Sequence, residues 1–174
     1  MKNNELLHLF TDGLMDALSA EHQIIKSLPK LIKLVSSPDL KEAMSKHLAE
    51  TENQVTRIEQ IFSILGMPAK EKTCEAMKGL AKEADEMVEG KSKSAILDVT
   101  IISALQKVEH YEIASYGTLR SFARHLGLDS EVIDLINESL EEEGNANKAL
   151  TKIADGTIFT TGVNKEAAGQ HAKR

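Results

Sequence analysis

Apolar residues recur every three or four positions through four long stretches of this 174-residue sequence. That spacing places them on one face of an α-helix, as Leu14, Ala17, Ile24 and Leu28 show in the first stretch. Aromatic residues make up 3% of the chain and Trp is absent, so the core must be built from Leu, Ile, Val, Ala and Met. This set of residue types suits helix packing better than sheet packing. The sequence therefore predicts an all-α protein.

Residues typical of helix ends set the boundaries of these stretches. Asn3 or Asn4 is predicted to cap the first helix, and Pro29 marks its end or a kink. Ser37 followed by Pro38 is a helix start signature, because Ser can cap and Pro tolerates the first helical position. The long helices are expected over about residues 5–29, 38–65, 95–125 and 130–154.

Between the second and third long helices, residues 73–88 form a shorter amphipathic segment that we interpret as an auxiliary helix. Two helix pairs joined by one long crossover are the plan of a ferritin-like four-helix bundle. Residues 1–155 are expected to form this bundle. Residues 156–174, rich in Gly and Thr, are expected to be a tail that is mobile or docks only through Ile158, Phe159 and Val163.

A glutamate interrupts the apolar stripe of each long helix. Two of them are three residues apart, about 60° around the helix axis, so both can point inward. Burying one unpaired carboxylate costs several kcal/mol, and several together repel each other. Lys and Arg lie mainly off these stripes, so we expect metal cations among the glutamates, and oxygen-rich ligands suit iron or manganese. The five predicted ligands are Glu21, Glu50, Glu109, Glu112 and Glu143.

Alternatives remain open for single residues. One glutamate on an approximate stripe is usually solvated, and the phase of the run 141–143 could favour Glu142 over Glu143. His47 is interpreted as a partner of Glu50, with a ligand role or a structural role as alternatives. Tyr116, four residues after Glu112, either bonds to the site or simply packs. Gln54, which interrupts the second stripe, is a candidate weak ligand or outer partner of the site, as are Asn53 and Asn147. The methionines are scattered core fillers, with no haem site expected.

Composition excludes several classes of function. The net charge of −6 and the pI near 5.5 argue against a nucleic-acid or anionic-membrane partner. The most apolar run, residues 95–105, contains Asp98 and is far shorter than the roughly 20 residues of a membrane helix. Cys74 stands alone, so it cannot form an internal disulfide and is expected to be an inert thiol. No signal peptide is recognisable, and a cytoplasmic location is expected.

Several stretches carry a family resemblance. They are LMDALSAEHQ, HLAETENQVTRIEQIF, CEAMKGLAKEADE, QKVEHYEIASYGTLRSFARHLG and ESLEEEGNANKALTKIA. On these the chain resembles the YciE/YciF family of ferritin-like stress proteins, from about Leu6 to Ala154. The resemblance implies a rubrerythrin-like bundle, metal binding, a link to stress and a homodimer. By position it implies that the same five glutamates are the ligands.

The chain departs from rubrerythrin-type sites at two places. A histidine is expected three residues after the second-helix glutamate, where this chain has Asn53. Another is expected four residues after the last glutamate, where it has Asn147 and the YciE/YciF family often has aspartate. Asn147 would be a weaker, neutral ligand. No Cys-x-x-Cys pair exists, which excludes a built-in rubredoxin-type electron donor.

Together these observations favour a non-haem protein with two metal ions, iron first and manganese second, that binds iron or reacts it with peroxide or oxygen during stress. The alternative is a dimeric helical interaction module whose metal site is vestigial or structural. A manganese catalase is disfavoured, because that chemistry typically uses histidine-containing sites and these stripes offer only His47.

Overall fold

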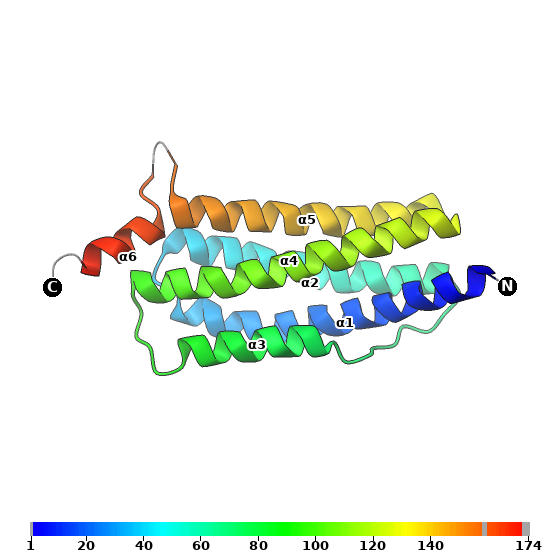
Figure 1. Cartoon of the computed structure of the whole chain (residues 1–174), viewed down its shortest axis with the longest axis horizontal. Helices are drawn as coiled ribbons and strands as arrows, with labels where there is room; N and C mark the ends of the chain where they lie inside the picture. The colour runs from blue at the N-terminus through cyan, green and yellow to red at the C-terminus, as the bar shows by residue number, and fades with distance from the viewer. Residues whose placement is uncertain (1, 158–159, 172–174) are drawn as a thin grey trace.

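The computed structural model describes residues 2–157 and 160–171, and its fold is an elongated bundle of helices (Figure 1). The described residues contain the helices α1 (Lys2–Leu34), α2 (Pro38–Ile64), α3 (Glu75–Val88), α4 (Ala95–Leu126), α5 (Ser130–Asp155) and α6 (Val163–His171). α1 runs antiparallel to α2, and α4 to α5. The connection from α2 to α4 returns along the bundle and carries α3, so α2 and α4 are parallel. The predicted ferritin-like bundle with one long crossover is confirmed.

Helix ends follow the predicted signals at most places. Ser37 caps α2 by accepting a hydrogen bond from the Leu40 amide at 3.3 Å. Gly127 ends α4 with a φ of 65°, a left-handed conformation that favours glycine. Pro29, however, does not end α1, which continues to Leu34. Burial of apolar residues beyond the proline stabilises this last turn despite the hydrogen bond that a proline cannot donate.

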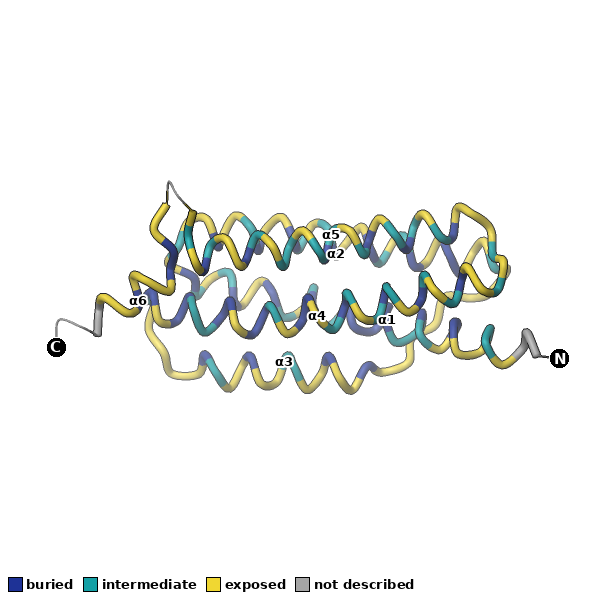
Figure 2. Tube along the Cα trace, turned by 45° about the horizontal axis from the view of Figure 1, so that its top comes forward, coloured by how far each residue is buried: buried dark blue, intermediate teal, exposed yellow. Residues whose placement is uncertain are grey.

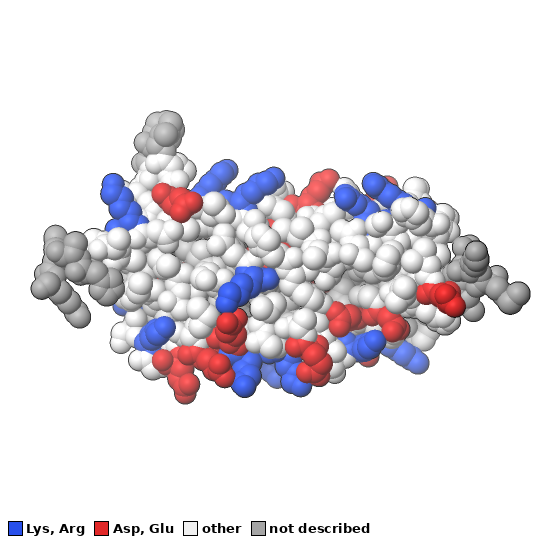
Figure 3. Space-filling model, in the orientation of Figure 1, with Lys and Arg blue, Asp and Glu red and all other residues white. Residues whose placement is uncertain are grey.

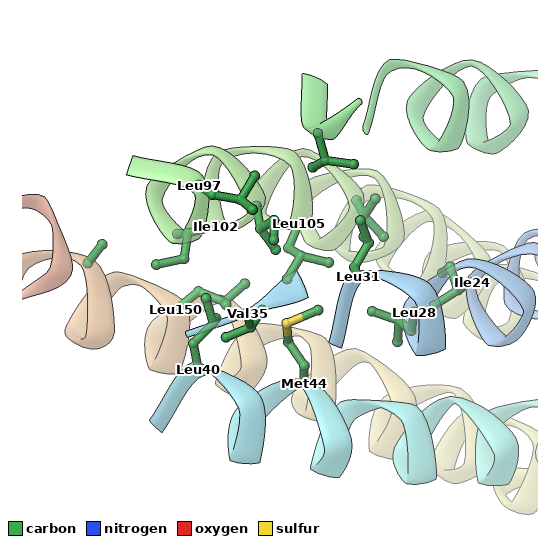
Figure 4. Close-up of a cluster of buried hydrophobic side chains, with 14 of the residues drawn as sticks. Ile24, Leu28, Leu31, Val35, Leu40, Met44, Leu97, Ile102, Leu105 and Leu150 are labelled. Carbon is green, nitrogen blue, oxygen red and sulfur yellow. The ribbon is translucent and has the colours of Figure 1, made fainter. Parts of the chain in front are cut away.

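The core consists of two hydrophobic clusters, one towards each end of the bundle. Buried positions face the inside of the bundle along all four long helices (Figure 2). The first cluster includes Leu28, Met44, Ile101 and Leu150, and Figure 4 shows part of it. The second includes Phe10, Leu14, Ile58, Leu119 and Ile136. Where the two clusters meet, the buried side chains are mostly polar, and this is where the predicted site lies.

The crossover helix α3 packs along α1 and α4 (Figure 1). Cys74 caps its first turn: the sulfur accepts a hydrogen bond from the Met77 amide at 3.3 Å and lies 3.0 Å from the Tyr111 hydroxyl. Tyr111 in turn donates to Asp16 of α1. Cys74 is 1% exposed, and burial raises the pKa of its thiol. The thiol is therefore part of the packing of α3, consistent with an inert role.

The tail contains a helix that the sequence pattern did not indicate. Gly156 has a φ of 80°, and a side chain at Gly162 would lie 2.2 Å from the backbone of Asp155, so both positions require glycine. This tight turn brings α6 back against α4 and α5, where Val163 and Ala167 are buried. Val163 thus docks as expected. Ile158 and Phe159 lie outside the described residues, as do the side chains of the predicted caps, Asn3 and Asn4.

Acidic and basic side chains are interspersed on the face shown in Figure 3. Among the described residues no helix is long and apolar enough to cross a membrane.

Candidate metal centre

Four of the five predicted glutamates lie inside the bundle between the two hydrophobic clusters. Glu21 of α1, Glu109 and Glu112 of α4, and Glu143 of α5 are each at most 1% exposed. For Glu21, Glu109 and Glu112 this burial follows from helix geometry, since each is three or four residues from an apolar neighbour that is itself buried. Glu143 lies one turn after the buried Ser139 of α5. Glu143, rather than Glu142, takes the inward position on α5. All four long helices contribute to the centre, because α2 supplies His47.

The imidazole of His47 lies among these carboxylates. Four residues each offer one ligand atom, and these atoms all lie within 4.8 Å of one another: His47, Glu109, Glu112 and Glu143. His47 Nε2 lies 3.5 Å from Glu109 Oε1, and Nδ1 lies 4.0 Å from Glu143 Oε2. His47 therefore faces these two glutamates and not Glu50, the partner that the sequence suggested. The set can surround one cation directly.

Glu21 extends the centre on the α1 side. The Tyr116 hydroxyl, which is fully inside the protein, donates a hydrogen bond to Glu21 Oε1. Burial raises the pKa of Tyr116, and the neighbouring negative charge of Glu21 raises it further. The tyrosine thus keeps its proton and holds one oxygen of Glu21 in place, which leaves Glu21 Oε2 free to face the cluster.

Polar atoms of this centre are buried without hydrogen-bond partners. Within the part of the chain that the structure describes, every such side-chain atom belongs to this region: Glu21 Oε2, both ring nitrogens of His47, Gln54 Oε1, Glu109 Oε2, both oxygens of Glu112, Glu143 Oε2 and Asn147 Oδ1. Buried polar atoms are normally paired, since leaving one unpaired costs about 1–3 kcal/mol. A shared cation would satisfy many of these atoms at once.

Asp98 shows what a buried structural carboxylate looks like in the same protein. It is 2% exposed and accepts three hydrogen bonds of 2.9 Å, from the Ser36 amide, the Ser36 hydroxyl and the Ser37 amide. These bonds tie the turn between α1 and α2 to the start of α4. Burial alone therefore does not explain the unpartnered glutamates of the centre.

Burial and mutual repulsion hold protons on the central carboxyls. Burial, followed by the charge of Glu143, raises the pKa of Glu109 to about 10 and that of Glu21 to about 8. The same two causes raise the pKa of Glu112 well above its usual value. Without a cation these groups are protonated at neutral pH. A metal ion must displace those protons to bind the carboxylates.

An outer layer of side chains fixes Glu143; it contains Gln54, which the sequence offered as an outer partner of the site, and Arg57, for which the sequence suggested no role. Gln54 donates hydrogen bonds to Glu143 Oε1 and, at 3.0 Å, to Glu142 Oε2. Arg57 makes two bonds of 2.7 Å to the carboxylate of Glu142 and one of 2.8 Å to Glu138. The spacing of Gln54 and Arg57 on α2 could have suggested a shared direction. Their partner on α5 could not be read from the sequence.

The remaining predicted residues lie at the edge of the centre or outside it. Glu50 is half-buried, with 18% of its side chain exposed, and its carboxylate pairs with Lys46. Asn147 is half-buried on α5, one turn after Glu143. Asn53 is exposed and does not join the centre, because Gln54 occupies the inward position on that turn of α2. The centre is thus richest in ligands on the α4 and α5 side.

An all-α bundle with one long crossover, and with polar residues from all four long helices meeting inside it, defines a ferritin-like protein. Comparison with known proteins gives the family. The chain belongs to the family described as "Domain of unknown function (DUF892)", which matches residues 5–168. It is 40% identical over 158 residues to Protein YciF of Escherichia coli (strain K12), covering 90% of this chain and 95% of that protein. The resemblance to YciE/YciF proteins is confirmed.

Two solved structures are similar. The crystal structure of the E. coli stress protein YciF has a TM-score of 0.80 and 40% identity, covering 84% of this chain and 92% of that one. YcfI from Rhodopseudomonas palustris, for which a structural role has been suggested, has a TM-score of 0.82 and 40% identity, covering 86% and 94%.

Proposed function

We propose that the buried centre binds two metal ions, iron first and manganese second, and that the protein uses them in a stress response by binding iron or reacting it with peroxide or oxygen. The observation that carries this proposal is the set of buried, unpartnered oxygen and nitrogen atoms contributed by four helices. Carboxylates with one imidazole are a donor set that suits iron and manganese. The description of the E. coli relative as a stress protein supports the setting.

The residues divide between the two ions by position. His47, Glu109, Glu112 and Glu143 would hold the first ion, since their ligand atoms already lie within 4.8 Å of one another. Glu21 would hold the second, with Glu50 completing it after release from Lys46. When bound, an iron pair would supply the electrons that reduce a peroxide or oxygen.

The rest of the chain positions these ligands. Tyr116 orients Glu21 and keeps its own proton on the hydroxyl oxygen. Gln54 orients Glu143, and Arg57 neutralises Glu142 beside it. The hydrophobic clusters at either end shield the carboxylates from solvent along the length of the bundle, which strengthens their attraction for a cation.

A second candidate is a dimeric helical module in which the centre is structural or vestigial. The raised pKa values of Glu21, Glu109 and Glu112 favour it, because protonated carboxyls can remain buried without metal. The structural role suggested for the R. palustris relative points the same way. The two candidates differ in whether the purified protein takes up metal.

Metal analysis by plasma mass spectrometry, after anaerobic loading with ferrous iron and desalting, separates them. We expect about two ions per chain in the wild-type protein, as in two-metal carboxylate bundles. Glu109→Gln with Glu112→Gln should abolish this binding with helical content preserved. Glu52→Gln with Glu59→Gln, two exposed positions on α2, is the matched control and should bind normally. Absence of bound metal in the wild type would favour the structural module.

Reactivity needs its own measurement. The ferrous-loaded protein should consume hydrogen peroxide faster than the same concentration of free ferrous iron in the same buffer. Equal rates together with stoichiometric loading would leave a metal-binding protein without peroxide chemistry.

A further inference from the structure

A cavity of about 320 Å³ leads from the surface to the metal centre between α2 and α5. Its inner end is formed by Glu109 and His47, which are at most 5% exposed. Glu109 Oε2 and both ring nitrogens of His47 have no hydrogen-bond partner. Its walls are apolar. Figure 4 shows four of the wall residues: Leu28, Met44, Leu105 and Leu150. The cavity therefore connects solvent with two of the proposed ligands.

The outer part of this cavity is lined by charged residues of α2. Asp39, Glu42, Lys46 and Glu50 follow one another at spacings of three and four residues, so they share one side of the helix. Asp39, Glu42 and Lys46 are exposed, and the Lys46 ammonium is held by Glu50. Counting Glu109, four carboxyl groups and one ammonium group line the cavity.

A second cavity that reaches His47 has a different character. It measures about 30 Å³ and lies under α3, with Met77, Ala84 and Val108 among its lining residues. Among the residues that the structure describes, no acidic side chain lines it. It is too small and too apolar to carry a hydrated ion, so the larger cavity is the better path to the centre.

We infer that the cavity between α2 and α5 is the port through which divalent cations reach the buried carboxylates, with Asp39 and Glu42 attracting the ion and Lys46 opposing it. The inference rests on the proposed metal binding and adds the route and its charge control. A cleft with a net charge of one sign and apolar walls focuses the electric field and raises the association rate of counter-ions by about 10 to 1,000-fold. Anions are disfavoured by the same charges.

The rate of cobalt uptake tests this role. Co²⁺ is mixed anaerobically with metal-free protein in a stopped-flow instrument, and its visible absorption is followed at low ionic strength. Asp39→Asn with Glu42→Gln should slow uptake about tenfold, and Lys46→Gln should speed it up about threefold, as the Coulomb energy between a divalent ion and each unit charge implies. Added NaCl should slow the wild type more than the double variant.

Equilibrium binding separates this inference from the proposed function. Neither Asp39→Asn with Glu42→Gln nor Lys46→Gln replaces a proposed ligand, so the cobalt stoichiometry of these variants at saturation should equal that of the wild type. Glu52→Gln, also an exposed α2 acid but outside the cavity lining, should leave the rate unchanged. If all variants took up cobalt at the wild-type rate and with the wild-type stoichiometry, the role of the cavity as a port would be refuted and the proposed metal binding would stand. A wild-type protein that binds no cobalt at saturation would overturn the proposed function and the port with it.

Discussion

Glu109→Gln should make the metal-free protein more stable above pH 5, although it removes a proposed ligand. In the folded chain the pKa of Glu109 is raised to about 10 from a usual value of 4.5, mainly by burial and then by the charge of Glu143. Between these two values the residue is protonated in the folded protein and ionised in the unfolded chain. The substitution keeps the shape of the protonated side chain and removes its ionisation.

The sign and size follow from proton linkage. A carboxyl with a raised folded pKa contributes its full stability below pH 4.5, and that contribution falls as the pH rises towards the folded value. The slope is about 1.4 kcal/mol per pH unit for each such group. From pH 5 to pH 8 Glu109 therefore accounts for a loss of up to about 4 kcal/mol in the wild type, which the variant escapes.

Urea unfolding followed by far-UV circular dichroism measures this effect at pH 5, 6, 7 and 8 in the presence of a chelator. Wild type and variant should have similar free energies of unfolding at pH 5 and diverge as the pH rises. Glu52→Gln is the control, since this exposed residue should leave the wild-type slope unchanged. Parallel pH dependences for wild type and Glu109→Gln would refute the reasoning, because they would mean that Glu109 is ionised in the metal-free fold.

Saturating metal should reduce the stability advantage that Glu109→Gln has over the wild type at pH 8. A ligand at 100 times its dissociation constant stabilises the folded state by about 2.7 kcal/mol. With Mn²⁺ in place of the chelator, the wild type should gain this stabilisation at pH 8 and Glu109→Gln should gain little of it. An equal gain in both proteins would show that Glu109 is not a ligand.

Three further outcomes are expected. Metal binding at pH 7 should release up to about three protons per chain, because Glu21, Glu109 and Glu112 have raised pKa values, and the apparent affinity for metal should rise with pH. Calorimetry in two buffers of different ionisation enthalpy measures the number of protons released. A release of no protons would contradict protonated carboxyls in the metal-free centre. Arg57→Gln should weaken cobalt binding about tenfold in a titration while helical content is kept, because the substitution releases Glu142 from the outer layer that fixes Glu143. Asp98→Asn should lower the free energy of unfolding by about 1–3 kcal/mol through lost hydrogen bonds while metal stoichiometry stays unchanged; a changed stoichiometry would show that this carboxylate is coupled to the centre.

The sequence by itself determined the helices and the inward direction of most polar residues. Periodicity decides which face of a helix is apolar, and Glu21, Glu109 and Glu112 sit within that face, so their burial follows from local geometry. Capping residues such as Ser37 and the glycine at 127 act within one turn of their own helix, so the ends of α2 and α4 were predictable too.

Tertiary structure decided what these side chains meet. Adjacent candidates such as Glu142 and Glu143 differ by about 100° around the helix, and only the orientation of α5 against α2 assigns one to Arg57 and the other to the interior. The partners of His47, on α4 and α5, are likewise set by packing between helices far apart in sequence.

The tail and the edge of the centre show the same limit. α6 lacks a clear apolar stripe, and it docks because a tight turn at Gly156 directs it onto α4. Glu50 lies close to the inward face of α2, yet its carboxylate pairs with Lys46 at the mouth of a cavity. Periodicity gives the direction of a residue around its own helix, whereas its partners depend on how the helices pack against one another.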